Sequence, residues 1–315
     1  MIVCAAPNPS IDKLFMSDVV RVGEIHRPQR VVARAGGKAL NAARAARALG
    51  ADVRAVALLA GHAGRWIAEE LEREGVPADA VWAPGESRSA LSVADGRAVT
   101  EFYERGDAPG PEAWERFVAA VEGAARGATW LSISGSVPPG IEPAEGARLV
   151  AAGHAGGARV AVDQHAATLA AALAAGADLV KVNHAEASEL TGEDDPLRAA
   201  RALAGALTAA GAPDPLAIVT LGEKGALAVT TGAVLRGDLD VRGPYPTGSG
   251  DSFLGGLLSA APPAATGADP DRWAAAMAVA LGAACANAEA EGAGTLDPER
   301  ARALAERARG RIRRE

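Results

Sequence analysis

The stretch TGSGDSFLGG, residues 247–256, places three small residues and an acid where an apolar helical segment begins. Gly248 and Gly250 can adopt backbone conformations closed to other residues, so consecutive N–H groups can point into one concavity at the positive end of the helix dipole. Such a concavity stabilises charge that develops on a transferred phosphoryl group. Asp251 would repel a resting phosphate, so we expect it to accept a proton from an attacking hydroxyl. The pattern predicts a kinase whose base is Asp251 and whose anion hole is formed by the amides of Gly248, Ser249 and Gly250.

A second glycine-rich stretch, AGGKALN at residues 35–41, is also expected to open a helix. Lys38 and Asn41 lie three residues apart, which places a cation and an amide on one helix face, a combination that suits a polyhydroxylated or anionic ligand. The stretch is not a Walker A loop, because Ala39 follows the lysine where that loop needs Ser or Thr. Gly, Ser and Asp are also common at helix starts, so helix capping by Ser249 or Asp251 is the alternative interpretation of the stretch at 247–256 when it is taken alone.

Four further motifs accompany these two stretches along the chain. They are Asn8-Pro9-Ser10-Ile11-Asp12, the turn Ser134 to Gly140, Lys181-Val182-Asn183-His184-Ala185-Glu186, and the turn Thr220 to Gly225. In order and spacing the set resembles the ribokinase-like sugar kinases of the PfkB family, and the match runs along most of the chain. A family assignment on six ordered motifs is far more specific than one on any single motif.

The resemblance implies a role for each matched residue. For the acceptor sugar it implies contacts with Asp12, Gly36, Gly37, Lys38, Asn41 and the Gly135 backbone. For ATP it implies Asn183, Thr220, Gly222, Gly225, Gly250 and Asn287, with Glu186 arranging Mg²⁺ through water. Asn287 has an alternative interpretation as an ordinary polar residue of a helix.

The acceptor is expected to carry a phosphate already, because Ser134-Gly135-Ser136 resembles the phosphosugar branch of the family, whereas ribokinase and its nearest relatives usually have an acid near the position of Gly135. Arg88, Arg27 and Arg105, together with Lys38, are the candidate phosphate ligands, since arginine binds phosphate in a bidentate manner. For each arginine alone, a solvated surface charge is the alternative.

Within that branch, the resemblance points first to phosphorylation of fructose 1-phosphate to fructose 1,6-bisphosphate, and next to tagatose-6-phosphate or fructose-6-phosphate kinases. Two other function classes stay open: a kinase of an unphosphorylated sugar or nucleoside, and a non-catalytic sugar-phosphate sensor. Retention of Asp251 argues against the sensor, which needs no base. Ala39, Ser249, Pro246 and Arg105 depart from the usual family residues, and Ala39 is expected to narrow the sugar pocket.

Composition is compatible with this assignment. The chain has 315 residues, 49% of them hydrophobic, and a formal net charge of −7, which argues against nucleic acid or an anionic membrane as the main partner. Cys4 and Cys285 belong to no spaced metal motif and are expected to be reduced. The N-terminus lacks a signal-type segment, so a soluble cytoplasmic protein is expected.

Short apolar runs alternate with helical segments, which is typical of an α/β fold with a mostly parallel central sheet covered by helices on both faces. Strands are expected at residues 2–6, 53–59, 130–134, 160–163, 179–182, 216–220 and 227–230, and helices at 64–74, 112–125, 196–210 and 272–287. We expect a single ribokinase-like domain over 1–315. Two Val- and Arg-containing segments, at about 13–34 and 88–107, are expected to form antiparallel strands of a small β-sheet lid. A homodimer through this lid is a further hypothesis.

Overall fold

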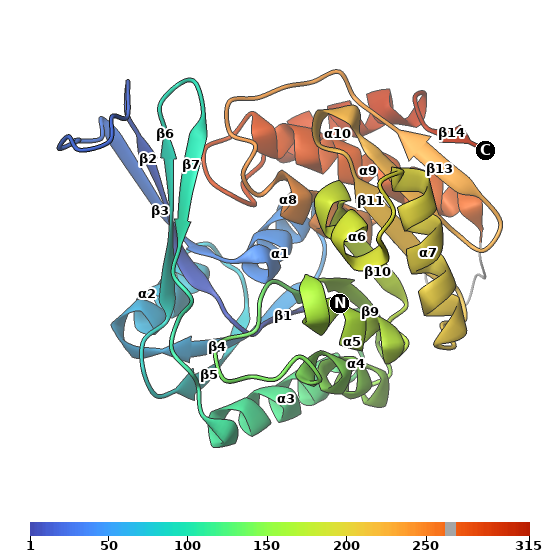
Figure 1. The fold of residues 1–315 in the computed structure, drawn as a ribbon, viewed down its shortest axis with the longest axis horizontal. Helices are drawn as coiled ribbons and strands as arrows, with labels where there is room; N and C mark the ends of the chain where they lie inside the picture. The colour runs from blue at the N-terminus through green and yellow to red at the C-terminus, as the bar shows by residue number, and fades with distance from the viewer. Residues whose placement is uncertain (262–268) are drawn as a thin grey trace.

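The computed structural model describes residues 1–261 and 269–315, and within them a ten-stranded sheet forms the centre (Figure 1). Its strands are β1 (Ile2–Ala6), β4 (Val53–Ala60), β5 (Ala78–Ala83), β8 (Trp130–Ser134), β9 (Arg159–Asp163), β10 (Leu179–Asn183), β11 (Leu216–Thr220), β12 (Ala226–Val229), β13 (Val234–Gly237) and β14 (Arg313–Arg314). The order is β14-β13-β12-β11-β10-β9-β8-β1-β4-β5, parallel from β11 to β5 and antiparallel beyond β11. This confirms the expected mostly parallel sheet.

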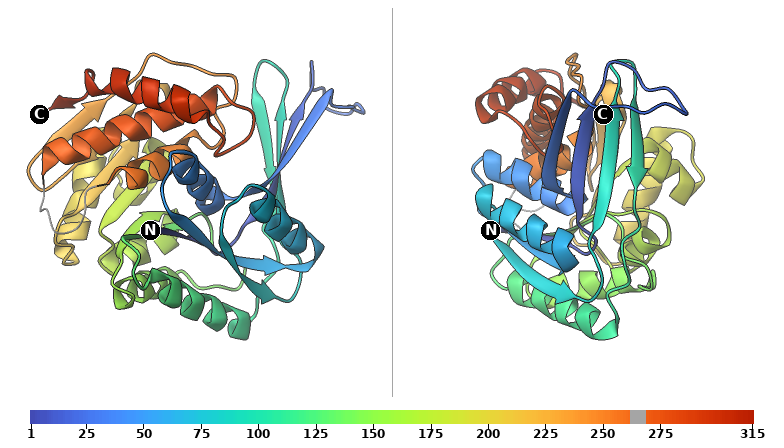
Figure 2. Two further views of the ribbon diagram at one scale, coloured as in Figure 1. Left: turned by 180° about the vertical axis from the view of Figure 1, so that it is seen from behind. Right: turned by 90° about the vertical axis from the view of Figure 1, so that its left-hand side faces the viewer.

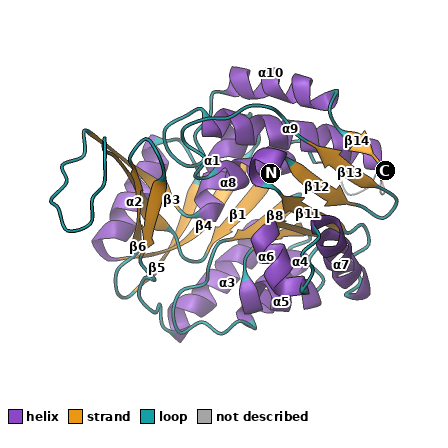
Figure 3. Ribbon diagram, turned by 45° about the horizontal axis from the view of Figure 1, so that its top comes forward, coloured by secondary structure: helices purple, strands orange, loops and turns teal. Residues whose placement is uncertain are grey.

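Helices cover both faces of the sheet, as Figure 3 shows. One face carries α1 (Lys38–Ala48), α2 (Gly61–Arg73), α8 (Ser249–Ser259), α9 (Pro270–Ala288) and α10 (Pro298–Arg309); the other carries α3 (Pro111–Ala125), α4 (Glu145–Ala155), α5 (Ala166–Ala174), α6 (His184–Thr191) and α7 (Pro196–Ala209). Because the strands are buried on both faces, two apolar cores form, one around Phe253 and Trp273 and one around Phe117 and Leu149. In the described part of the chain, no helix combines the length and apolarity needed to span a membrane.

A four-stranded sheet stands beside this body (Figure 2). Its strands are β2 (Ser10–Met16), β3 (Arg30–Gly36), β6 (Arg88–Ala94) and β7 (Val99–Tyr103), in the order β3-β2-β6-β7. The β2–β3 and β6–β7 pairs are antiparallel as expected, but β2 and β6 pair in parallel, which corrects the antiparallel expectation. The reason is that β2 follows β1 and β6 follows β5, and both of these strands run in the same direction in the central sheet.

The two sheets meet at the edge of the central sheet where residues of the predicted motifs lie at the ends of strands. Asp163 and Asn183 close β9 and β10, and α8 begins at Ser249. Carboxyl ends of parallel strands lie at one edge of a sheet, where α/β proteins bind ligands. The small sheet lies over this edge, and the candidate site lies between the two sheets.

Candidate active site

The turn that precedes α8 depends on glycine at one position. Gly248 is the N-cap residue of α8 and has φ 82° and ψ −2°. A Cβ added to it would lie 2.5 Å from the Ala293 Cβ and 2.8 Å from the Gly294 nitrogen. Both the left-handed conformation and this close packing therefore require glycine.

The amides of the turn divide into two kinds. The N–H of Ser249 donates to the carbonyl of Pro246 at 3.1 Å, so it is already engaged, in contrast to the expectation that it forms part of the anion hole. The reason is that residues 246–249 close a turn of their own. The N–H groups of Gly248 and Gly250 have no protein acceptor within the described residues.

Asp251 lies in the first turn of α8 and is 8% exposed. Asn41 Nδ2 donates to its Oδ2 at 2.9 Å. Burial and the nearby Asp163 raise the pKa of Asp251 to about 6, although Lys181, Lys38 and the Asn41 hydrogen bond act in the opposite direction. A carboxyl with this pKa is ionised at neutral pH and can take up a proton there.

Two lysines flank Asp251 and share a buried carboxylate. Lys38 Nζ lies 2.8 Å from Asp163 Oδ1 and 3.2 Å from Glu186 Oε1, and Lys181 Nζ lies 2.6 Å from Asp163 Oδ2. Burial opposes the charged form of Asp163, but the two lysines hold its pKa below the usual value. Burial likewise opposes the charge on Lys38, yet Asp163 and Glu186 raise its pKa. The result is a buried charged cluster at the carboxyl ends of β9 and β10.

Asp163 and Lys181 lie within expected strands, but neither was predicted to be a site residue. The signal that could have identified Asp163 is its place as the last residue of a buried parallel strand, an edge where ligands bind. No sequence pattern predicts that Asp163 pairs with Lys38, which is 125 residues away in sequence.

Asp12 is held by Ser10 and by the glycine-rich stretch at residues 35–41. It accepts hydrogen bonds from Ser10 Oγ at 2.6 Å and from the Gly37 N–H at 3.2 Å. A Cβ on Gly36 would lie 2.0 Å from the Asp12 Cγ, so Gly36 makes room for this carboxylate. Burial raises the pKa of Asp12, while the Ser10 and Gly37 hydrogen bonds and the charge of Arg88 oppose the rise.

Asn183 and Glu186 form a reciprocal capping box at the start of α6, with both hydrogen bonds at 2.9 Å. Glu186 thereby has one oxygen on the Asn183 N–H and the other on Lys38. Nearby, Gly225 has φ 85°, and its Cβ position would lie 2.0 Å from the Gly237 carbonyl. The turn at Gly222 and Gly225 is therefore also one that glycine alone accommodates.

Three cavities surround these residues. The first, of about 470 Å³ under the small sheet, is lined among others by Asp12, Gly37, Lys38, Asn41, Arg88, Asn183, Gly248 and Asp251. The second, of about 430 Å³, is lined by Lys38, Lys181, Asn183, Glu186, Thr220, Gly222, Gly225, Ser249, Gly250 and Asp251. Lys38, Asn183 and Asp251 belong to both, so the two cavities meet at the candidate base.

The third cavity, of about 700 Å³, adjoins the first at Gly37, Lys38 and Arg88. Its lining adds Arg105, Gly135 and Ala39. Asn8 Nδ2 bridges the Arg105 carbonyl at 3.1 Å and Ser136 Oγ at 3.2 Å, which ties the Asn8 motif to the turn around Gly135. Two expected phosphate ligands, Arg88 and Arg105, are thus brought together.

Two expected site residues lie elsewhere. Arg27 is exposed in the loop between β2 and β3 and is absent from the linings of these three cavities, since that loop extends beyond the small sheet. Asn287 is fully buried: it accepts from Ser252 Oγ at 2.9 Å and the Gly294 N–H at 2.8 Å, and donates to the Thr247 carbonyl at 3.0 Å. These internal hydrogen bonds hold the turn before α8, and Asn287 does not line the second cavity, where ATP was expected.

Comparison with known proteins identifies the family and the fold of this chain. The model of the pfkB family carbohydrate kinases matches residues 7–301. A protein from Haloferax volcanii named 1-phosphofructokinase is 33% identical over 269 residues, which cover 82% of this chain and 84% of the relative. The structure of phosphofructokinase-2 from Escherichia coli in complex with fructose-6-phosphate superimposes with a TM-score of 0.84 at 25% identity, over 98% of each chain. Ribokinase from Giardia lamblia shares the fold, with a TM-score of 0.79 at 18% identity over 97% of this chain and 99% of that one.

Fold and site together define a kinase with a ribokinase-like α/β fold. The chain belongs to the PfkB family of carbohydrate kinases, whose members use ATP as co-substrate.

Proposed function

We propose that this carbohydrate kinase transfers the γ-phosphoryl group of ATP to a hydroxyl of a phosphosugar, with fructose 1-phosphate as the first candidate acceptor and fructose 1,6-bisphosphate as the product. The observation that carries the proposal is the meeting of two cavities at Asp251: a nucleotide in the second cavity and a sugar in the first would face each other across it. The relative named 1-phosphofructokinase supports the choice of acceptor.

In the proposed reaction, Asp251 accepts the proton of the attacking sugar hydroxyl. Lys38 and Lys181 place positive charge beside it, where negative charge spreads over the transferred group. The free N–H groups of Gly248 and Gly250 add donors at the helix N-terminus. Asp12 and Asn41 bind sugar hydroxyls, and the small sheet acts as a lid of a single domain over 1–315 and keeps water from the poised phosphoryl group.

Mg²⁺ is proposed to bind at Glu186, beside Asn183, through water. Mg²⁺ commonly takes one or two protein carboxylates and completes its shell with water and substrate phosphates. The oxygen-donor chemistry of Glu186 fits this, because its carboxylate lines the second cavity. No cluster of three His, Cys, Asp or Glu side chains in the described residues could hold a metal unaided, which is compatible with an ion that arrives with the nucleotide. There it would neutralise charge on the phosphates.

The phosphate already on the acceptor is proposed to lie in the third cavity, on Arg88 and Arg105. A second candidate acceptor is fructose 6-phosphate, favoured by the similar Escherichia coli structure that is described as a complex with that sugar. The cavity linings do not include the tip of the lid, so Arg27 is not assigned to the phosphate. A cytoplasmic location is part of the proposal, because ATP and phosphosugars occur there.

The proposal is tested by ATP consumption with Mg²⁺ against fructose 1-phosphate, fructose 6-phosphate, tagatose 6-phosphate, fructose, ribose and adenosine. We expect turnover of one phosphosugar, with the highest kcat/KM for fructose 1-phosphate. Turnover of only an unphosphorylated acceptor would refute the proposed phosphate site. No turnover of any compound in the panel would favour a non-catalytic sugar-phosphate sensor.

Replacement of Arg88 by Met tests the phosphate site. Arg88 Nε is held by the Asn8 carbonyl at 3.1 Å, which fixes the guanidinium between the first and third cavities. Loss of a charge-assisted hydrogen bond is expected to raise KM for the phosphosugar about 10- to 100-fold. Steady-state kinetics should show an unchanged KM for ATP. Arg54→Met, which removes an exposed arginine paired with Asp79, is the control and should behave as wild type.

A homodimer through the lid is the proposed assembly. Strand pairing puts Phe15, Val31, Leu91, Val93 and Phe102 on one face of the small sheet, opposite the face that lines the first cavity. Val31 is 53% and Phe102 61% exposed, so the apolar face is open to a partner.

Size-exclusion chromatography with light scattering should give a dimer at micromolar concentration for the wild type. Phe102→Asp should give a monomer, because it places a charge in the middle of the apolar face. Thr100→Asp, which replaces a polar residue on the same strand and face, is the comparison and should disturb the dimer less than Phe102→Asp. A monomeric wild type would refute the assembly.

A further inference from the structure

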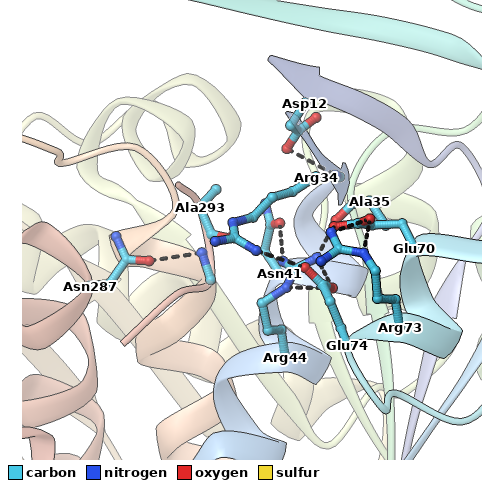
Figure 4. Close-up of polar contacts among 12 residues, drawn as sticks. Asp12, Arg34, Ala35, Asn41, Arg44, Glu70, Arg73, Glu74, Asn287 and Ala293 are labelled. Carbon is cyan, nitrogen blue, oxygen red and sulfur yellow. Dashed lines mark hydrogen bonds and ion pairs between the residues drawn. The ribbon is translucent and has the colours of Figure 1, made fainter. Parts of the chain in front are cut away.

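A buried arginine in α1 lies one helical turn after Asn41 (Figure 4). Arg44 is 9% exposed, and its guanidinium donates to four partners. Nε donates to Glu74 Oε2 at 2.8 Å; Nη1 donates to Asn41 Oδ1 at 3.2 Å and to the Ala293 carbonyl at 3.0 Å; Nη2 donates to the Ala35 carbonyl. The Glu74 carboxylate balances the buried charge and also pairs with Arg34 at 3.1 Å.

This contact decides which way the Asn41 amide points. A guanidinium has donors and no acceptor, so the Asn41 atom that faces Arg44 must be the oxygen. The amide nitrogen then faces Asp251 and donates to it. With the amide reversed, two donors would face each other at Arg44 and two acceptors at Asp251.

We propose that Arg44 is a positioning residue for phosphoryl transfer: it fixes the side-chain amide of Asn41 so that this amide always donates to the Asp251 carboxylate and thereby holds the base in its ionised form. The proposal rests on the base role of Asp251 proposed above. Arg44 acts through Asn41 and does not line the first or second cavity.

The other charged groups that shift the pKa of Asp251 come from other positions, so the contribution of the Asn41 hydrogen bond can be measured separately. Asp163 on β9 raises its pKa, and Lys181 on β10 and Lys38 on α1 lower it. Tyr103 on β7 is itself influenced by the charges of Asp251 and of Asp12 on β2. Hydrogen bonding by Asn41 is the remaining contribution that lowers the pKa of Asp251, and it is the one that Arg44 controls.

The experiment titrates the Asp251 carboxyl directly. The ¹³C carboxyl resonance of labelled aspartate, assigned with Asp251→Asn, is followed from pH 4.5 to 8.5 in the wild type, Asn41→Ala, Arg44→Met and the double variant. The wild-type pKa is expected at about 6. Loss of a hydrogen bond to a charged group should raise it by about one unit in Asn41→Ala, and by about half to one unit in Arg44→Met.

The double variant distinguishes an effect of Arg44 through the orientation of the Asn41 amide from a direct effect of the arginine charge on Asp251. If Arg44 acts through Asn41, adding Arg44→Met to Asn41→Ala causes no further shift; a direct effect of the arginine charge would add to it. An unchanged pKa in Arg44→Met, or additive shifts in the double variant, overturns the proposal. Should Arg44→Met not fold, Arg44→Lys replaces it in the same cycle. The single ammonium group of lysine cannot donate to both Glu74 and Asn41 as the planar guanidinium does.

Arg159→Met is the matched control for loss of a buried arginine. Its side chain is 12% exposed, pairs with Asp178 and Asp214, and stacks on Trp130 away from the cavities. It should lower the melting temperature without moving the Asp251 titration. In active protein, the acidic limb of kcat/KM should move with the titration in Arg44→Met and stay in place in Arg159→Met. A wild type without kinase activity would count against the proposed function, while the titration would still decide the role of Arg44.

Discussion

Asp251→Asn is expected to lower kcat about 10²- to 10⁴-fold at pH 8, because asparagine keeps the shape of the side chain but cannot take the proton of the attacking hydroxyl. In the wild type, kcat/KM should fall as the pH drops through about 6, where the buried carboxyl becomes protonated. The sign follows from the raised pKa: the base is active above it and lost below it. Initial rates of ATP consumption with the acceptor identified by the panel provide the measurement.

Loss of activity must be distinguished from loss of structure. ATP affinity, measured by calorimetry, and the melting temperature should stay close to wild type in Asp251→Asn. Asp297→Asn is a suitable control, because it removes an equal charge at a residue that lines none of the three cavities. Asp297 caps α10 by accepting the Arg300 N–H at 2.8 Å. The substitution should change stability little, because Asn caps a helix about as well as Asp, and it should leave kcat unchanged. If kcat falls by less than tenfold in Asp251→Asn, a group other than Asp251 accepts the proton of the attacking hydroxyl.

The fold followed from local patterns in the sequence. The expected strand at 160–163 and helix at 112–125 each appear within one residue of the observed bounds, because apolar runs and helical periodicity depend on burial alone. The parallel pairing of β2 with β6 did not follow, since it depends on how two distant crossovers leave the central sheet. Strand direction within a sheet is a property of topology, which short segments do not encode.

The site was predictable where a motif carries its own geometry and not where it depends on distant contacts. Gly248 and Asp251 sit in one contiguous stretch, so their juxtaposition could be inferred. Asp163 and Arg44 could not, because their roles depend on partners that the fold brings from elsewhere, such as Lys38 and Glu74. Asn287 was assigned to the nucleotide because the family resemblance implied it, whereas its side chain faces the inside of the turn before α8.

Gly248→Ala is expected to lower kcat about 10²- to 10³-fold, comparable to the loss of an anion-hole donor. The added methyl group would overlap Ala293 and the backbone of Gly294, which cannot yield as a flexible side chain would. The turn would therefore have to move, and the N–H groups of residues 248 and 250 would move with it. Steady-state kinetics and thermal denaturation provide the measurements.

Gly192→Ala separates displacement of the turn from simple backbone strain. Gly192 ends α6 with φ 72° and ψ 10°, nearly the conformation of Gly248, but a Cβ there meets no atom within 4 Å. Both substitutions incur the left-handed strain of about 1 kcal/mol, while only Gly248→Ala adds steric overlap next to Asp251. We therefore expect similar small losses of stability from strain, with a large loss of kcat in Gly248→Ala alone. Equal kcat values in the two variants would mean that the position of the turn does not matter to the reaction, and the anion hole would have to be sought at Lys38 and Lys181 instead.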